Sequence, residues 1–454
     1  MIFLNKRSKT AVLVSIILAM LVASMDTTIT NTTMPVVADD LGGMRLFAWT
    51  FATYMIFSTV MTPLAGRISD LYGRKRIFGI GIIIFTLGSL LCGMSASMLQ
   101  LVIFRAIQGL GAGLMLPFPS IIASDLFPLA QRGKIQAAFN AMWGIAAIVA
   151  PVLGGLFTEY ASWRWIFYIN LPIGLVALLF LQWYQEPYEA KRARVDVGGA
   201  VLFSFSITLL LSLTVVESYI AAIAIAGTVF TVAFIWWERR VSAPLIPINL
   251  VKDRTLALFI GNAFLNSCAF FGVSSFIPLV LQEKGYSVIT SGLPLVAMSI
   301  GWIAVGGPSG TWILRWGYRP LMLIGSAVLL VSGVMLVFIG EATSFAYIMF
   351  PMVLQGVSFG LLVTVSILSV QQLVPNDQRG VATSVLMFAR NTGTAICVTV
   401  MGALLYGADL FYTGVRNLFI YGIVLAALAL VAAWMIPRSE GSMLDGEGED
   451  TPSS

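Results

Sequence analysis

Long apolar runs separated by short polar segments occupy almost the whole chain. A helix needs about 20 apolar residues to cross the hydrocarbon core of a bilayer. The pattern therefore predicts an all-α membrane protein with fourteen transmembrane helices and both termini on one side. We place the spans near residues 10–33, 47–69, 76–96, 100–126, 137–158, 164–184, 198–216, 219–237, 256–281, 288–314, 319–339, 345–373, 380–406 and 416–436.

Composition supports the membrane prediction and narrows the chemistry. Only 10% of the residues are charged and 58% are hydrophobic, whereas soluble domains carry about 25% charged residues. The chain has no histidine, which excludes a histidine metal site. Cys92, Cys268 and Cys397 lie far apart in apolar runs and predict neither a disulfide framework nor a zinc site. We find no nucleophile–base pair and expect no enzyme activity and no cofactor.

The positive charges orient the spans. If the N-terminus is cytoplasmic, 20 of the 26 Lys and Arg residues fall in inner segments and 4 in outer segments, with Arg105 and Arg390 inside spans. This bias is what the positive-inside rule requires. Because the net charge of +5 is spread over many loops, it argues against a nucleic-acid surface.

The basic start around Lys6 and the apolar run from Thr10 are superficially similar to a signal peptide. The run is long, carries Asp26 and has no small-residue cleavage site, so we interpret it as a retained first span.

Three pieces of the sequence recur at a nearly constant distance, which indicates an internal repeat. Gly66 and Gly310, like Gly73 and Gly317, are 244 residues apart, while the distance is 247 residues for Gln108 and Gln355 and for Gln131 and Gln378. The repeat predicts two six-helix bundles running in the same direction, an arrangement typical of transporters. We assign residues 1–184 to the first bundle, 185–254 to two inserted helices with their loops, 255–437 to the second bundle and 438–454 to a disordered acidic tail.

Four motifs carry a resemblance to a known family. They are Gly66-x-x-x-Asp70-x-x-Gly73-Arg74-Lys75-Arg76, Arg105-x-x-Gln108-Gly109-x-Gly111-x-Gly113, Met25-Asp26-x-x-x-x-Asn31-x-x-x-Pro35, and Ala150-Pro151-x-x-Gly154-Gly155. The fourth departs from the family pattern, which has glycine where Ala150 stands. With these motifs the chain, apart from its acidic tail, resembles the 14-spanning drug:proton antiporter branch of the major facilitator superfamily.

The resemblance implies a proton-coupled antiporter that exports small lipophilic drugs or other small molecules by alternating access. It would act as a monomer in the bacterial cytoplasmic membrane, with the proton gradient as its energy source and with protons, lipophilic substrates and the bilayer as its partners. A dedicated exporter of a metabolite, a lipid or a peptide derivative remains an alternative, as does a membrane sensor that transports nothing.

Asp26 and Arg105 are the candidate proton-coupling pair. Asp26 lies about 24 Å along the first span and about 10 Å from its outer end, while Arg105 is about 7 Å deep in the fourth span. The matching depths predict that the two side chains pair. A charge at this depth has to pair, face water or be neutralised. The alternatives are a structural ion pair for Asp26 and a snorkelling side chain for Arg105.

A second constellation is expected at the inner ends of helices 2 and 4. The resemblance implies a conformational latch formed by Gly66, Asp70, Gly73, Arg74 and Asp125. The second repeat has Leu314 at the place of Asp70, so the latch would be one-sided. Charges that merely set the topology are the alternative interpretation.

The remaining candidates are glycines and polar residues within spans. No G-K-[ST] sequence follows the glycine run from Gly109, so it does not indicate ATP binding. In the fourth motif, Pro151, Gly154 and Gly155 would bend and seal helix 5, or serve helix packing alone. The candidates for lining a substrate cavity are Asn31, Tyr54, Gln108, Asn140, Trp143, Asn262, Asn266, Gln355, Arg390 and Asn391. Because the second half has no deep acid, we expect neutral, zwitterionic or monovalent substrates.

Overall fold

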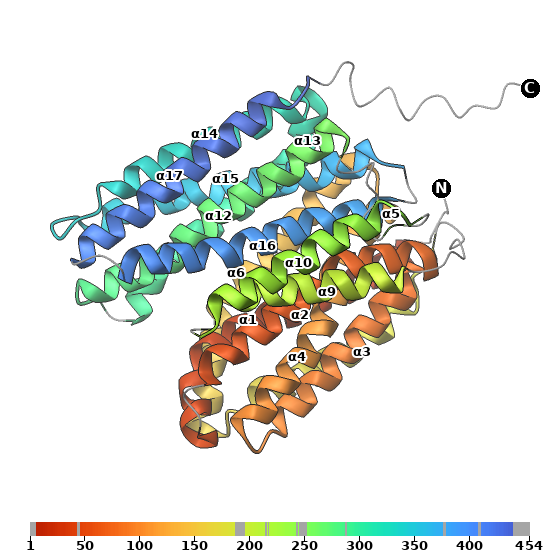
Figure 1. Ribbon diagram of the computed structural model, residues 1–454, viewed down its shortest axis with the longest axis horizontal. Helices are drawn as coiled ribbons and strands as arrows, with labels where there is room; N and C mark the ends of the chain where they lie inside the picture. Colours follow the sequence, from red (N-terminus) through yellow and green to blue (C-terminus); the bar gives the residue numbers. More distant parts are fainter. Residues whose placement is uncertain are drawn as a thin grey trace, which may run out of the picture. The chain divides into compact units, whose positions relative to one another are not determined.

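The computed structural model consists of α-helices in the residues that it describes (Figure 1). It describes residues 6–42, 46–186, 196–213, 216, 218–241, 244, 252–286, 288–375, 378–406 and 410–438. The tail predicted to be disordered lies outside these residues except for its first position, Arg438.

The helices separate into two compact units, each held together by its own contacts. The first unit contains α1 (Lys6–Leu41), α2 (Phe47–Tyr72), α3 (Arg74–Gly93), α4 (Met98–Met115), α5 (Phe118–Leu126), α7 (Trp165–Tyr168), α8 (Asn170–Leu181), α9 (Val197–Ser212) and α10 (Ile220–Glu238). The second unit contains α12 (Arg254–Glu283), α13 (Val288–Trp316), α14 (Tyr318–Val337), α15 (Phe345–Leu373) and α17 (Phe411–Met435).

Two long helices contribute to both units. The start of α6 (Leu129–Tyr160) belongs to the second unit and the rest, from Met142, to the first. The helix α16 (Arg379–Tyr406) shows the reverse, with its residues up to Thr392 in the first unit and the remainder in the second. The two helices occupy corresponding places in the sequence repeat.

Helix packing follows the same order in both units, which confirms the internal repeat. In the first unit α4 packs against α2 and α3, and α8 packs against α1 and α3. In the second unit α15 packs against α13 and α14, and α17 packs against α12 and α14. The inserted helices α9 and α10 have no counterpart in this scheme. They run side by side, and α9 also packs against α2 (Figure 1).

The number of spans is supported in part. Ten helical segments of the described chain are long and apolar enough to cross a membrane. The four other predicted spans coincide with α2, α6, α9 and the consecutive helices α7 and α8. The total of fourteen crossings stays a prediction.

Prolines divide two of the predicted spans. The span at 100–126 consists of α4 and α5, and the break falls at Pro117, which has no backbone N–H to continue the helical ladder. The span at 164–184 begins with the short α7, and α8 restarts with Pro172 in its first turn, where proline is tolerated.

The glycine run of α4 serves close helix packing. A Cβ atom on Gly109 or Gly113 would meet the backbone of α2 at Tyr54 or Ser58. A Cβ atom on Gly111 would meet the backbone of α3 at Phe85. Small residues allow helix backbones to approach closely in lipid, so the alternation of these glycines holds α4 against two neighbours.

A polar brace joins loops to helix ends in each unit. In the first unit Trp163 Nε1 donates to Asp40 at 2.8 Å, and Arg164 contacts both Asp40 at 3.5 Å and the Ser95 carbonyl at 3.3 Å. In the second unit Lys284 Nζ donates to three carbonyl oxygens at 2.7–2.9 Å, those of residues 340, 341 and 343. Desolvation lowers the pKa of Lys284, and the nearby charge of Glu341 acts in the opposite direction.

The expectation that the cysteines form no disulfide is wrong for one pair. Cys268 on α12 and Cys397 on α16 form a disulfide with a Cα–Cα distance of 5.1 Å. They are 129 residues apart in sequence, and only the packing of the two helices brings them together. Cys92 is free and buried.

We predict that Gly111→Val destabilises the protein by about 1–3 kcal/mol or more, because the new side chain would overlap the backbone of α3. Heating followed by size-exclusion chromatography measures the loss. Gly261→Ala is the control, since nothing lies within 4 Å of the position of its Cβ. Equal stability of the two variants would contradict the packing role of Gly111.

Candidate functional site

The predicted pair of Asp26 and Arg105 is present within the first unit. Arg105 Nη1 lies 2.6 Å from Asp26 Oδ2, and the two side chains are 1% and 0% exposed. The pair joins α1 to α4, as predicted from the sequence. Such burial means that neither charge is compensated by water.

Amide groups complete the shell around the carboxylate. Gln108 Nε2 donates to Asp26 Oδ1 at 2.7 Å, and Asn170 Nδ2 donates to the same oxygen at 3.2 Å. Gln108 Oε1 in turn accepts from Arg105 Nη1 at 2.9 Å. We refer to Asp26, Arg105, Gln108 and Asn170 as the Asp26 cluster.

Arg105 has acceptors besides Asp26 and Gln108. Its Nε donates to the Thr50 carbonyl at 3.4 Å, and its guanidinium carbon lies 4.2 Å from the centroid of the Tyr54 ring. A cation over an aromatic face is stabilised by the ring quadrupole. The Tyr54 hydroxyl is buried and has no hydrogen-bond partner among the described residues.

The second predicted constellation is also assembled in the first unit. Arg74 pairs with Asp125, and its Nη2 lies 3.3 Å from Asp70 Oδ1. Asp70 Oδ2 accepts from the backbone N–H of Val381 at 3.0 Å, so the carboxylate satisfies one of the free amides in the first turn of α16. We refer to Asp70, Arg74 and Asp125 as the Asp70 cluster.

The segment after α8 holds the Asp70 cluster in a way that the sequence did not indicate. Tyr184 Oη donates to Asp125 Oδ2 at 2.6 Å. Glu186 Oε1 accepts from the backbone N–H of Lys75 at 2.8 Å, at the start of α3, and its carboxylate fills the space beside Gly73. Gly73 adopts φ of 99°, a conformation that favours glycine.

Close backbone contacts explain two further glycines. A Cβ atom on Gly66 would overlap Gly380 and Ser384 of α16 in the first unit. In the second unit a Cβ atom on Gly310 would overlap Gly133 of α6. These are corresponding positions of the repeat, yet only the first contact has an acidic neighbour, because Leu314 replaces Asp70.

The other cavity candidates are distributed over both units. Asn262 Nδ2 donates to the Ala429 carbonyl at 2.7 Å, and Asn266 donates to Asn262. Gln355 is buried with its Oε1 unpartnered among the described residues. Trp143 is half-buried, as are Arg390 and Asn391 on the part of α16 that belongs to the first unit.

The fourth motif is described only in part. Gly154 is buried, whereas Gly155 is exposed and has nothing within 4 Å of the position of its Cβ. The side chains of Asn31, Asn140 and Pro151 lie outside the described residues. A sealing or bending role for this motif therefore stays a prediction.

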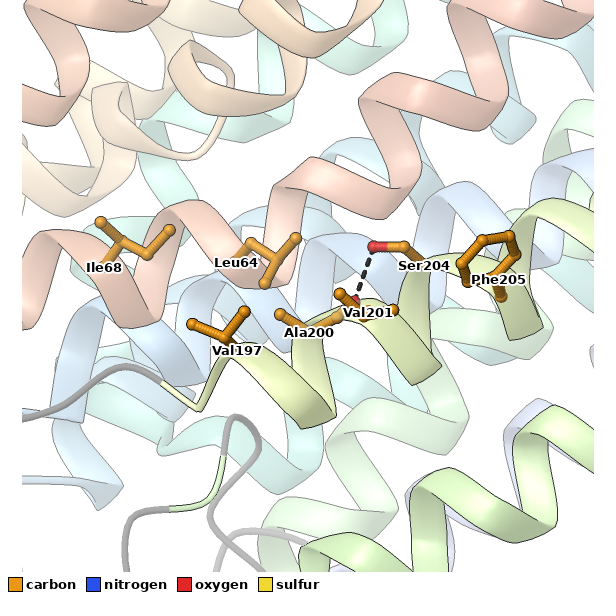
Figure 2. A pocket seen from close by; sticks show the side chains of 7 residues that line it. All are labelled: Leu64, Ile68, Val197, Ala200, Val201, Ser204 and Phe205. Carbon is orange, nitrogen blue, oxygen red and sulfur yellow. Dashed lines mark hydrogen bonds between the residues drawn. The ribbon is translucent and has the colours of Figure 1, made fainter.

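An apolar groove of about 270 Å³ lies between α2 and α9 (Figure 2). It is lined by Leu64, Ile68, Val197, Ala200, Val201, Ser204 and Phe205. The one hydroxyl in this lining, that of Ser204, donates to the Ala200 carbonyl at 2.7 Å. The groove thus offers no free hydrogen-bond donor, and none of its lining residues is among the predicted cavity residues.

Relatives of the chain are named as drug transporters. Multidrug resistance protein 3 of Bacillus subtilis is 35% identical over 404 residues, which cover 86% of this chain and 78% of the relative. Multidrug transporter protein MdtP of the same organism is 32% identical over 415 residues, covering 88% of this chain and 76% of the relative.

A solved transporter structure has a similar fold. The crystal structure of the human organic anion transporter MFSD10 matches with a TM-score of 0.73 at 16% identity, covering 94% of this chain and 100% of that one. The sequence model of the family described as Major Facilitator Superfamily matches residues 16–398 and 260–452 of this chain. The chain has two helical units with the same packing scheme, carries the family's motifs in the expected helices and matches the family model along its length. It therefore belongs to the Major Facilitator Superfamily.

Proposed function

We propose that this chain is a proton-coupled antiporter that exports small lipophilic compounds across a bacterial cytoplasmic membrane by alternating access. The observation that carries the proposal is the fully buried Asp26 carboxylate, paired with Arg105 inside the membrane-spanning part of the first unit. The names of the relatives support multidrug efflux, and the positive-inside bias supports cytoplasmic termini.

A carboxylate in this position is suited to exchange a proton for a substrate. Its charged form is costly to bury unless its partners stay in place. Burial favours the neutral form and the adjacent arginine favours the charged form, so a change in helix packing shifts the balance between the two. Protons would enter from outside and bind Asp26, and the substrate would leave in exchange.

If Asp26 were protonated, the positive charge of Arg105 would still have three other partners. The guanidinium keeps Gln108 Oε1 at 2.9 Å, the Thr50 carbonyl at 3.4 Å and the face of Tyr54. An unpaired buried charge is strongly destabilising, and these three acceptors reduce that cost. These contacts would keep Arg105 partnered if Asp26 took up a proton.

The second unit supports a preference for substrates of low charge. In its described residues the acids are Asp253, Glu283 and Glu341, which lie at helix ends or in a loop and are exposed. None can neutralise a cation deep in the membrane. Neutral, zwitterionic or monovalent substrates fit this chemistry, and a tight preference for dicationic dyes would contradict it.

The Asp70 cluster would act as a conformational latch. The Asp70 carboxylate binds α16 through Val381 N–H and α3 through Arg74, and Asp125 of α5 shares the same arginine. Movement of α16 away from α2 would break the contact to Val381 and expose a carboxylate that is otherwise paired. The cluster therefore opposes that movement until other contacts offset the cost.

We predict that Asp26→Asn abolishes proton-driven efflux while the protein still inserts. The variant removes the titratable group but retains the size of the side chain and its hydrogen-bonding capacity. Fluorescent-dye transport in inverted membrane vesicles with an imposed pH gradient measures the loss. Asp39→Asn is the matched control on α1, because Asp39 is exposed, and it should transport like the wild type.

Two outcomes of this assay would reject the proposal. Normal gradient-driven transport by Asp26→Asn would remove Asp26 from the coupling mechanism. A wild-type protein that binds dye but moves none under any gradient would instead favour a membrane sensor.

We predict that Arg74→Gln destabilises the protein by about 3–5 kcal/mol, because Asp70 and Asp125 both lose the buried cation with which they pair. The matched variant Arg76→Gln should change stability by less than about 0.5 kcal/mol, since Arg76 is exposed. Heating followed by size-exclusion chromatography compares them. Addition of Asp125→Asn to Arg74→Gln should restore part of the loss, and no restoration would argue against charge pairing as its cause.

A further inference from the structure

Asn170 is the member of the Asp26 cluster that the sequence did not single out. It begins α8 and is 1% exposed. Among the described residues it is the one side chain outside α4 that donates to Asp26, because Arg105 and Gln108 both belong to α4. A donor on a different helix can change its distance to Asp26 independently of the other two.

The orientation of the Asn170 amide is determined by its neighbours. Its Nδ2 donates to Asp26 Oδ1 at 3.2 Å and to Ser89 Oγ at 2.9 Å. Ser89 uses its own hydroxyl hydrogen to bind the Phe167 carbonyl at 2.8 Å, so its oxygen is left to accept. Both acceptors therefore require the amide nitrogen, and the Asn170 oxygen cannot replace it without losing one of them.

We propose that Asn170 is a positioning residue that sets the proton affinity of Asp26 by donating to its charged form, and that it links this affinity to the packing of α8 against α1 and α3. The inference rests on the proposed role of Asp26 in proton coupling. A hydrogen bond to the ionised form of a carboxyl group favours ionisation. Separation of α8 from α1 would remove this donor and favour proton uptake.

The other titratable groups near Asp26 do not provide the same control. Those that face it in the described residues are Arg105 on α4, Tyr54 on α2 and Cys92 on α3. Arg105 is charged at all relevant pH values. Among the described contacts neither Tyr54 nor Cys92 donates to Asp26, since the Tyr54 ring lies against Arg105 and the Cys92 thiol donates to Gln108. Asn170 is therefore the contact through which α8 can act on the carboxylate.

The test is a pH titration of Asp26 in the purified full-length protein in lipid nanodiscs. Infrared difference spectra against Asp26→Asn isolate the carboxylic acid C=O band of Asp26. In Asn170→Leu the pH of half-protonation should rise by about one unit, a tenfold increase in proton affinity, because a hydrogen bond to the charged form is lost. The pH profile of dye efflux should shift in the same direction.

Ser15→Ala is the matched control. Ser15 Oγ donates to the Ala177 carbonyl at 2.7 Å, so this variant also removes a buried polar contact between α1 and α8 but leaves Asp26 untouched. Its half-protonation pH should equal that of the wild type. A shift as large as that of Asn170→Leu would show that helix packing alone is responsible and would overturn the proposal.

Asn170→Ala provides a second deletion of the donor if Asn170→Leu does not elute as a folded protein. An unchanged half-protonation pH in a folded Asn170 variant would overturn the inference. The titration needs no substrate, so its result is independent of transport. Absence of gradient-driven efflux in the wild type would reject the proposed function, while the titration would still decide the role of Asn170.

Discussion

The ion pair between Asp26 and Arg105 is the constraint on which the chemistry of the first unit depends. Two opposite charges that are almost fully buried require acceptors and donors on every side. The amides of Gln108 and Asn170, the Thr50 carbonyl and the ring of Tyr54 supply them. The close glycine contacts of α4 with α2 and α3 hold Arg105 and Gln108 near these partners.

The two units share a packing scheme, but the side chains at corresponding positions of the repeat differ in charge and polarity. At the offset of 244 residues that relates Gly66 to Gly310, the position of Asp26 corresponds to Phe270. Phe270 stacks on Phe359 with ring centroids 3.8 Å apart. The second unit therefore has an aromatic contact where the first has an ion pair, which is consistent with proton coupling in the first unit alone.

The same asymmetry occurs where α16 packs against α2 in the first unit and where α6 packs against α13 in the second. Gly66 meets Gly380 and Gly310 meets Gly133, but Asp70 adds a carboxylate only to the first contact. Tyr184 and Glu186 support that contact from the segment that leads toward the inserted helices α9 and α10.

The membrane setting, the repeat and the Asp26–Arg105 pair could be predicted from the order of residues alone. Hydropathy, loop charge and helical rise are properties of consecutive residues, so they can be read along one chain. The places of Asn170 and Tyr184 in the two clusters, and the pairing of Cys268 with Cys397, became visible only once the helices were packed together. These contacts join residues 59 to 144 positions apart. The partners of these side chains depend on how the helices rotate and pack against one another.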